Sequence, residues 1–217
     1  SYTFAEATWS QSLPDWVASH QRMLNFFGGV PELLVPDNLK AAVTKADRYS
    51  PTINETYAEL ACHYQTAVLP ARPYKPKDKA KAETSVLLVE RWILARLRHQ
   101  TFFSLAELNT AIAALLPALN QRPFQGRVES RQSLYDAIDR PALRPLPATP
   151  YTYAEWRKAR PGIDYHIEID KRLYSVPHAL VGLVLDVRLT DTALEVMHKG
   201  QRVALPPRHG KSRFVTL

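Results

Sequence analysis

The sequence contains no apolar run of about 18 residues or more, so no membrane-spanning helix is expected. Its first stretch, SYTFAEATWS, lacks the basic start and apolar core of a signal peptide. It also lacks an initiator methionine, which suggests a processed product or a part of a longer chain. Hydrophobic residues make up 46% and charged residues 23%, and this balance is typical of a globular protein.

Cysteine is almost absent. The single Cys62 excludes an internal disulfide framework and any zinc site built from several cysteines. Because an export signal is also lacking, a reducing cytoplasm is the expected compartment. Cys62 and His63 could be two metal ligands, but no second pair converges on them. A buried thiol beside a partly exposed histidine is the simpler interpretation.

Acidic residues become scarce relative to basic ones after residue 74. The formal net charge is +7, with 28 Lys and Arg against 21 Asp and Glu. Residues 1–74 carry 5 basic against 7 acidic residues, residues 75–140 carry 11 against 7, and residues 141–217 carry 12 against 7. The basic excess thus begins at KPKDKAK. It predicts a polyanionic partner, of which nucleic acid is the commonest.

Hydrophobic periodicity predicts alternating strands and helices over the first hundred residues. The expected strands lie in residues 2–6, 33–35 and 66–73, and the expected helices in 13–27, 54–65 and 77–100. Asn54 is the expected N-cap of the second helix, and Gly28 with Gly29 ends the first. Such an order indicates a three-layer α/β or mixed domain.

Two further helices and a proline-rich segment follow. Residues 104–121 begin with a capping box formed by Ser104 and Glu107, and residues 130–139 form the second helix. The segment RPALRPLPATP, residues 140–150, places four prolines in eleven positions, so it reads as a semi-rigid linker. We therefore expect a domain over residues 1–100 and a helical segment with linker over 101–150.

The remaining residues, 151–217, predict a small all-β domain with a basic tail. Short alternating stretches are separated by turn signals at Asp170-Lys171, Asp191-Thr192 and Lys199-Gly200. That spacing is typical of a small β-barrel or sandwich.

Two carboxylates are candidates for a metal site. Asp37 follows the predicted strand at 33–35, and Glu83 lies in the first turns of the long predicted helix. Ligands of open α/β sheets gather beyond the carboxyl ends of strands, and Mg²⁺ prefers carboxylate oxygens and water. Taken singly, however, Asp37 is also an ordinary turn residue and Glu83 an ordinary partner of a helix dipole.

Four stretches, FFGGVPELLVPDNLKAAV, LPARPYKPKDKAKAE, VERWILARLRH and LRPLPATPY, closely resemble the IstA-type transposases of bacterial insertion sequences. The resemblance runs over essentially the whole chain. It implies the DDE transposase and retroviral integrase superfamily, with an α/β, RNase H-like catalytic core followed by a helical linker and a small all-β barrel. It also implies that Asp37, in VPDN, and Glu83, in KAKAE, are catalytic ligands of Mg²⁺, for which Mn²⁺ can substitute.

The sequence departs from this family in one respect. The family's first catalytic aspartate lies on an earlier strand, and Glu6 and Asp15 are the only carboxylates before Glu32. Neither follows an apolar strand in the right place. We therefore expect an N-terminally incomplete catalytic core, without the family's helix-turn-helix, that is inactive as it stands.

Basic residues form two sets of expected DNA contacts. Lys75, Lys77, Lys79 and Lys81 alternate ahead of Glu83, where a phosphate contact or merely a solvated helix start would explain them. The second set belongs to the C-terminal domain and its tail: Arg157, Lys158, Lys171, Arg172, Lys211 and Arg213. The tail itself is expected to become ordered on DNA, or else only to aid solubility.

The resemblance implies metal-dependent cleavage at the DNA 3′ ends of an insertion sequence, followed by strand transfer. The implied partners are double-stranded DNA of the ends and the target, further copies of the chain in a dimer or tetramer, and an AAA+ ATPase. No membrane is expected, and the implied location is the bacterial cytoplasm at the nucleoid. A non-catalytic DNA-binding and assembly module, or a metal-free basic scaffold, would fit the composition equally well.

Overall fold

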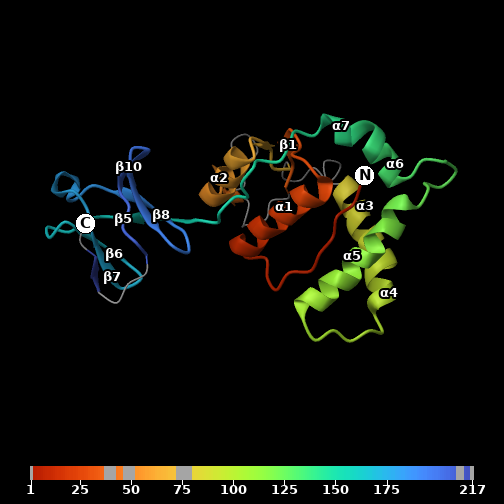
Figure 1. Ribbon diagram of the computed structural model, residues 1–217, viewed down its shortest axis with the longest axis horizontal. Helices are drawn as coiled ribbons and strands as arrows, with labels where there is room; N and C mark the ends of the chain where they lie inside the picture. The colour runs from red at the N-terminus through yellow and green to blue at the C-terminus, as the bar shows by residue number, and fades with distance from the viewer. Residues whose placement is uncertain (1, 37–42, 46–51, 72–79, 209–212, 216–217) are drawn as a thin grey trace. The chain divides into compact units, whose positions relative to one another are not determined.

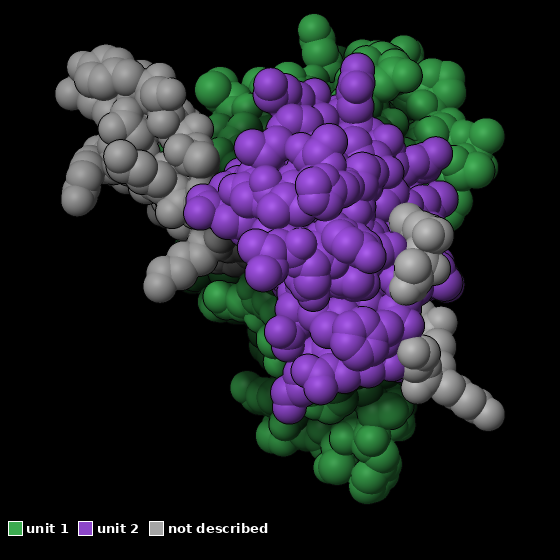
Figure 2. All heavy atoms as spheres, turned by 90° about the vertical axis from the view of Figure 1, so that its left-hand side faces the viewer, with its two compact units in different colours: residues 1–151 green, residues 152–217 purple. Residues whose placement is uncertain are grey.

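The computed structural model describes residues 2–36, 43–45, 52–71, 80–208 and 213–215. The chain forms two compact units, unit 1 over Ser1–Tyr151 and unit 2 over Thr152–Leu217 (Figures 1 and 2). Within the described ranges, no helix has the length and apolar character needed to cross a bilayer.

The first helix, α1 (Leu13–Phe27), has the predicted bounds. Pro14 stands in its first turn, where a missing amide proton costs nothing. Gly28 ends the helix in the left-handed conformation, with φ +67°, and donates its amide to the carbonyl oxygen of Asn25. A Cβ at Gly29 would lie 2.7 Å from Leu143 Cβ, so this position requires glycine for a close approach.

A parallel strand pair follows α1. β1 (Leu33–Leu34) pairs with β4 (Ala67–Val68), and both lie within the two strands expected at residues 33–35 and 66–73. Between them runs α2 (Glu55–His63), and Asn54 caps it as expected, by accepting hydrogen bonds from two backbone amides. A short antiparallel hairpin of β2 (Val43–Lys45) and β3 (Thr52–Ile53) was not predicted.

The expected strand at residues 2–6 is not formed, and this prediction is wrong. The segment is extended, but it lies against α5 (Leu105–Gln121) instead of another strand. Asn120 exchanges two hydrogen bonds with the backbone of Thr3, and Asn109 exchanges two with Ala7. Side-chain amides thus take the place of the neighbouring strand that a sheet would supply.

The long predicted helix is continuous but changes its winding. It consists of α3 (Ala80–Val89), the π-helical turn η2 (Glu90–Leu94) and α4 (Ala95–Leu97). α5 runs back beside it (Figure 1), and the two share a core of Ile93, Leu97, Ile112, Leu116 and Leu119. Ser104 caps α5 as predicted, whereas Glu107 accepts from the amide of Phe103, one residue further back than in a capping box.

The last helical stretch of unit 1 is α6 (Arg131–Leu134), η3 (Tyr135–Asp139) and α7 (Arg140–Ala142). The proline-rich segment after it is tied to unit 1 by several bonds. Val30 and Arg144 exchange backbone hydrogen bonds at 2.8 and 3.0 Å, and His63 Nε2 lies 2.9 Å from the carbonyl oxygen of Thr149. Arg144 and Thr149 of the expected semi-rigid linker are therefore held by residues of unit 1.

Unit 2 contains two sheets, in which most neighbouring strands are antiparallel, and one short 3₁₀ turn, η4 (His178–Leu180). The first sheet has the order β10-β9-β8-β5, with β5 (Glu155–Ala159), β8 (Leu185–Leu189), β9 (Leu194–His198) and β10 (Gln201–Ala204). The second has the order β11-β7-β6, with β6 (His166–Ile169), β7 (Arg172–Ser175) and β11 (Phe214–Val215).

The sheets bury a common apolar core that includes Ile167, Tyr174, Leu185, Val187 and Leu194. No ladder of hydrogen bonds joins the two sheets within the described strands, so the expected barrel is present as two sheets and is not closed. The predicted turn at Asp170-Lys171 is confirmed, because both residues have positive φ, as a two-residue hairpin loop requires. Strand β5 was not predicted, since EWRKA has almost no apolar alternation.

Candidate functional site

The strand that precedes Asp37 is in place. Pairing with the second strand continues beyond β1, since Ala71 donates its amide to the carbonyl oxygen of the buried Pro36 at 3.0 Å. Asp37 itself lies outside the described residues. The described part of this strand ends at Pro36, and ligands of α/β sheets gather at the carboxyl ends of parallel strands.

The backbone of Glu83 lies in α3, in the first turns of the long helix, as predicted. Lys81 belongs to the same turn, whereas Lys75, Lys77 and Lys79 lie outside the described residues. Within the described residues, no group of three His, Cys, Asp or Glu side chains could hold a metal ion.

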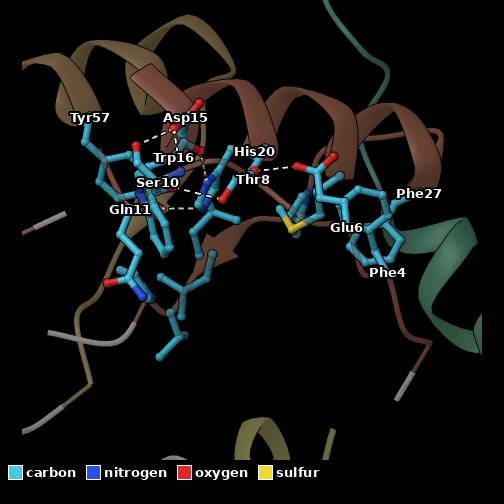
Figure 3. A pocket seen from close by; sticks show the side chains of 17 residues that line it. Phe4, Glu6, Thr8, Ser10, Gln11, Asp15, Trp16, His20, Phe27 and Tyr57 are labelled. Atoms are coloured by element: carbon cyan, nitrogen blue, oxygen red, sulfur yellow. Dashed lines mark hydrogen bonds between the residues drawn. The ribbon is translucent and has the colours of Figure 1, made fainter. Parts of the chain in front are cut away.

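A pocket of about 580 Å³ adjoins the strand that leads to Asp37. Its walls are formed by α1, by the extended segment from Phe4 to Gln11 and by residues Leu33 to Pro36. In Figure 3, Trp16, His20 and Tyr57 gather at one end and Phe4 and Phe27 at the other. Most of the lining is apolar.

The two charged side chains that line this pocket are acidic and have partners of their own. Glu6 receives two hydrogen bonds from the Arg22 guanidinium, at 2.6 and 2.9 Å, and one from the Ser19 hydroxyl. Asp15 accepts from the amide and hydroxyl of Ser10, at 3.1 and 2.5 Å. Among the described residues that line the pocket, both carboxylates are thus engaged with protein groups.

The partly buried His20 and the buried Tyr57 form a polar pair in this pocket. The Nδ1 atom of His20 lies 2.9 Å from the carbonyl oxygen of Trp16, which can only accept, so this nitrogen carries the proton. The Nε2 atom then accepts from the Tyr57 hydroxyl at 3.1 Å. Burial lowers the pKa of His20 and raises that of Tyr57, so both groups are neutral at physiological pH. Sequence reasoning missed this pair, for which the spacing of Trp16 and His20 was the only local signal.

Several expected DNA contacts in unit 2 have internal partners. Arg157 bonds to Glu155 at 2.8 Å and to Asp170 at 2.7 Å, and this second bond is the main reason that the pKa of Asp170 is lowered. Lys158 lies 3.1 Å from Asp186. Arg172 donates to the carbonyl oxygen of Arg208 at 3.0 Å. Their contacts with DNA stay predictions, and DNA would have to share these cations with the protein.

The other expected contacts of unit 2 are placed differently. Lys171 is exposed on the hairpin turn, and Arg213 is exposed beside β11, where its carbonyl oxygen accepts from the amide of Leu173 at 2.9 Å. Lys211 lies outside the described residues. Cys62 is exposed, not buried as expected, and His63 is engaged with Thr149.

Comparison with known proteins gives matches over almost the whole chain. A Sinorhizobium fredii protein named "Putative transposase y4bL/y4kJ/y4tB" is 55% identical over 216 residues, which are 99% of this chain and 42% of that protein. A Burkholderia multivorans protein named "Putative transposase for insertion sequence IS408" is 50% identical over 99% of this chain and 41% of its own length. The "Transposase for insertion sequence element IS21" of Pseudomonas aeruginosa is 28% identical over 84% of this chain and 47% of its own.

Residues 146–216 match the family described as Mu transposase, C-terminal domain. This match covers the end of the proline-rich segment, from residue 146, and nearly all of unit 2. The resemblance drawn from the sequence motifs is confirmed by these relatives. The chain spans about 42% of the length of the Sinorhizobium protein and about 41% of the Burkholderia one.

Proposed function

We propose that this homologue of the insertion-sequence transposases contributes the second and third carboxylates of a DDE-type active site. The activity would be metal-dependent cleavage at the 3′ ends of the element and transfer of those ends into target DNA. The observation that carries the proposal is the similarity of 99% of this chain to part of two transposases, together with the place of Asp37 in sequence after a parallel strand and of Glu83 in a long helix.

The donor chemistry of Asp37 and Glu83 suits Mg²⁺, since a hard ion takes one or two carboxylates, with water and substrate phosphates as its other ligands. Bound there, the ion would stabilise the charge that develops on the phosphate and favour the deprotonated nucleophile. The two carboxylates would hold it through their oxygens and orient the scissile phosphate.

The reaction has two displacements at phosphorus. In the first, the oxygen of water bonds to the phosphorus, the bond to the 3′ oxygen breaks, and that oxygen leaves as a hydroxyl. In the second, this 3′ hydroxyl loses its proton and attacks a phosphodiester of the target, from which the other 3′ oxygen departs. The first step hydrolyses one phosphoester bond, and the second forms one such bond while another breaks. Neither step changes an oxidation state, so no redox partner is required.

The open edge of β1 supports an RNase H-like core that a further strand completes. The carbonyl oxygens of Glu32, Leu34 and Pro36 all face the second strand, so the alternate residues Leu33 and Val35 direct their backbone groups to the opposite edge. The described part of the chain supplies no strand there, and both side chains are about half exposed, at 43% and 55%. A strand carrying the first catalytic aspartate would cover this edge and adjoin the pocket.

The same proposal includes the partners. Double-stranded DNA is the substrate, a dimer or tetramer would bridge the two ends, and an AAA+ ATPase would assist target selection in the bacterial cytoplasm. A second candidate function, a DNA-binding and assembly module, is favoured for unit 2 by its match to the Mu transposase C-terminal domain. The two functions can coexist in one protein.

Substitution of the carboxylates tests the proposal. In the full-length protein, Asp37→Asn and Glu83→Gln each remove an anionic metal ligand with little change of shape. We expect strand transfer of a pre-cleaved end to be lost while binding of that end is retained. The control is Asp136→Asn, a carboxylate of η3 paired with Arg140. Transfer at the wild-type rate in either ligand variant would overturn the proposal.

A further inference from the structure

Three arginines that the sequence did not single out gather at the end of α5. Arg96 belongs to α4, Arg122 follows directly after α5, and Arg131 begins α6. They come from three separate elements of unit 1. A charged cluster assembled from separate elements needs an explanation, because local helix stability does not require it.

Aromatic rings hold these guanidinium groups in place. The guanidinium carbon of Arg122 lies 3.9 Å from the ring centroid of Trp92, and that of Arg96 lies 4.9 Å from the same ring. The guanidinium carbon of Arg131 lies 4.9 Å from the ring of Phe124. Stacking on a ring restrains a planar guanidinium before any ligand arrives, and this lowers the entropy cost of a later hydrogen bond.

The loop between α5 and α6 brings two of the arginines together. Pro123 and Ser130 form an isolated antiparallel bridge, and Phe124 donates its amide to the carbonyl oxygen of Glu129 at 3.0 Å. The bridge joins the two ends of the loop. Arg122 and Arg131, which flank the bridged pair in sequence, therefore lie at its base.

This arrangement leaves the positive charges uncompensated by protein. Within the described ranges, no carboxylate makes an ion pair with Arg96, Arg122 or Arg131. The pKa of Arg131 is lowered, first by burial and then by the charge of Arg122. Like charges held close together are unfavourable, and a bound anion would relieve the repulsion.

We propose that this arginine–aromatic surface, formed by Arg96, Arg122, Arg131, Trp92 and Phe124, binds the phosphate backbone of duplex DNA. Guanidinium groups make paired hydrogen bonds to phosphate oxygens. A guanidinium group already lies over each ring, which leaves less ring surface for stacking of unpaired bases, and this favours a duplex over a single strand. The identification of the polyanion as DNA rests on the proposed function.

The test measures DNA affinity against salt in the full-length protein, with a fluorescein-labelled duplex of random sequence as the probe. Phosphate contacts are independent of sequence, so this probe reports them. In the double variant Arg122→Gln/Arg131→Gln, we expect the slope of log affinity against log salt to decrease by about 1.8, since each lost phosphate contact removes about 0.9. The variant Arg122→Lys/Arg131→Lys retains both charges and should keep the slope.

Arg140→Gln is the matched control, because it removes a positive charge of unit 1 that is paired with Asp136 at 3.6 Å. Thermal unfolding of every variant checks that the fold is retained. An unchanged slope in a folded glutamine variant overturns the proposal, as does an equal decrease in Arg140→Gln. An unchanged DNA slope with lost binding of a polyglutamate probe would assign the surface to an acidic protein instead. Binding is measured without catalysis, so the outcome is independent of the Asp37 and Glu83 variants.

Discussion

Asn120 holds Thr3 through two reciprocal hydrogen bonds across 117 positions of sequence. The Thr3 amide donates to Asn120 Oδ1 at 2.9 Å, and Asn120 Nδ2 donates to the Thr3 carbonyl oxygen at 2.8 Å. Asn109 holds Ala7 in the same way, at 2.7 and 3.0 Å. The two asparagines are about three helical turns apart, so they lie on one face of α5 and bind the segment at both ends.

Replacement of Asn120 should therefore destabilise unit 1. Asn120→Ala removes both hydrogen bonds that its side chain makes with the backbone of the buried Thr3, and we expect the free energy of unfolding to fall by about 1–3 kcal/mol. Urea unfolding measures the change. Asn109→Ala, at a partly buried site, is the comparison and should cost less. Equal stability of Asn120→Ala and the wild type would contradict the structural role.

The partly buried His20 predicts a loss of stability in acid. Burial lowers the pKa of His20 in the folded state from the ordinary value of 6.5. Below pH 6.5 the imidazole is therefore protonated in more of the unfolded than of the folded molecules. The free energy of unfolding should hence decrease as pH falls below 6.5, until the folded-state pKa is reached. Urea unfolding from pH 8 to 5 measures this, and His20→Gln should remove that contribution. A variant with the same pH dependence as the wild type would exclude His20 as the cause.

The four lysines ahead of Glu83 predict a change in salt dependence. If Lys75, Lys77, Lys79 and Lys81 contact phosphates, their replacement by alanine should flatten the slope of log affinity against log salt by about 0.9 for each contact on duplex DNA. Fluorescence anisotropy at several salt concentrations measures the slope. A slope identical to that of the wild type would make these lysines a solvated face of the protein.

The number of available carboxylates predicts that this chain alone does not join DNA ends. Asp37 and Glu83 provide too few oxygens to fix two ions, and Glu6 is engaged by Arg22 and Ser19. The purified 217-residue chain is to be assayed with Mg²⁺ and Mn²⁺ beside a chain extended upstream. We expect joining only in the extended chain. Joining by the shorter chain, lost again in Glu6→Gln, would show that Glu6 completes the site.

Local signals in the sequence determined much of the helical structure. Asn54 and Ser104 cap α2 and α5 because their side-chain oxygens reach amides within three residues, and Gly28 ends α1 because it tolerates a positive φ. The turn at Asp170-Lys171 was also predictable from local sequence, because two polar residues separate two strand-like stretches there. The motifs around Asp37 and Glu83 also indicated the resemblance to transposases, because a short sequence motif can be recognised without knowledge of the fold.

Only the tertiary structure decided which groups bind the backbone of the extended segment and which groups contact the basic side chains. Residues 2–6 have the alternation of a strand, but Asn120 binds the backbone of Thr3, and Asn109 binds that of Ala7 directly after them. No local pattern connects these asparagines with the segment. The sequence indicates that Arg157 is a DNA contact, whereas the fold places its guanidinium group 2.7 Å from the carboxylate of Asp170. From sequence alone Arg122 is only a residue that follows a helix, whereas in the fold its guanidinium group lies over the ring of Trp92. Hydrogen bonds and charges act over a few ångströms of space, and the packing of distant elements sets that distance.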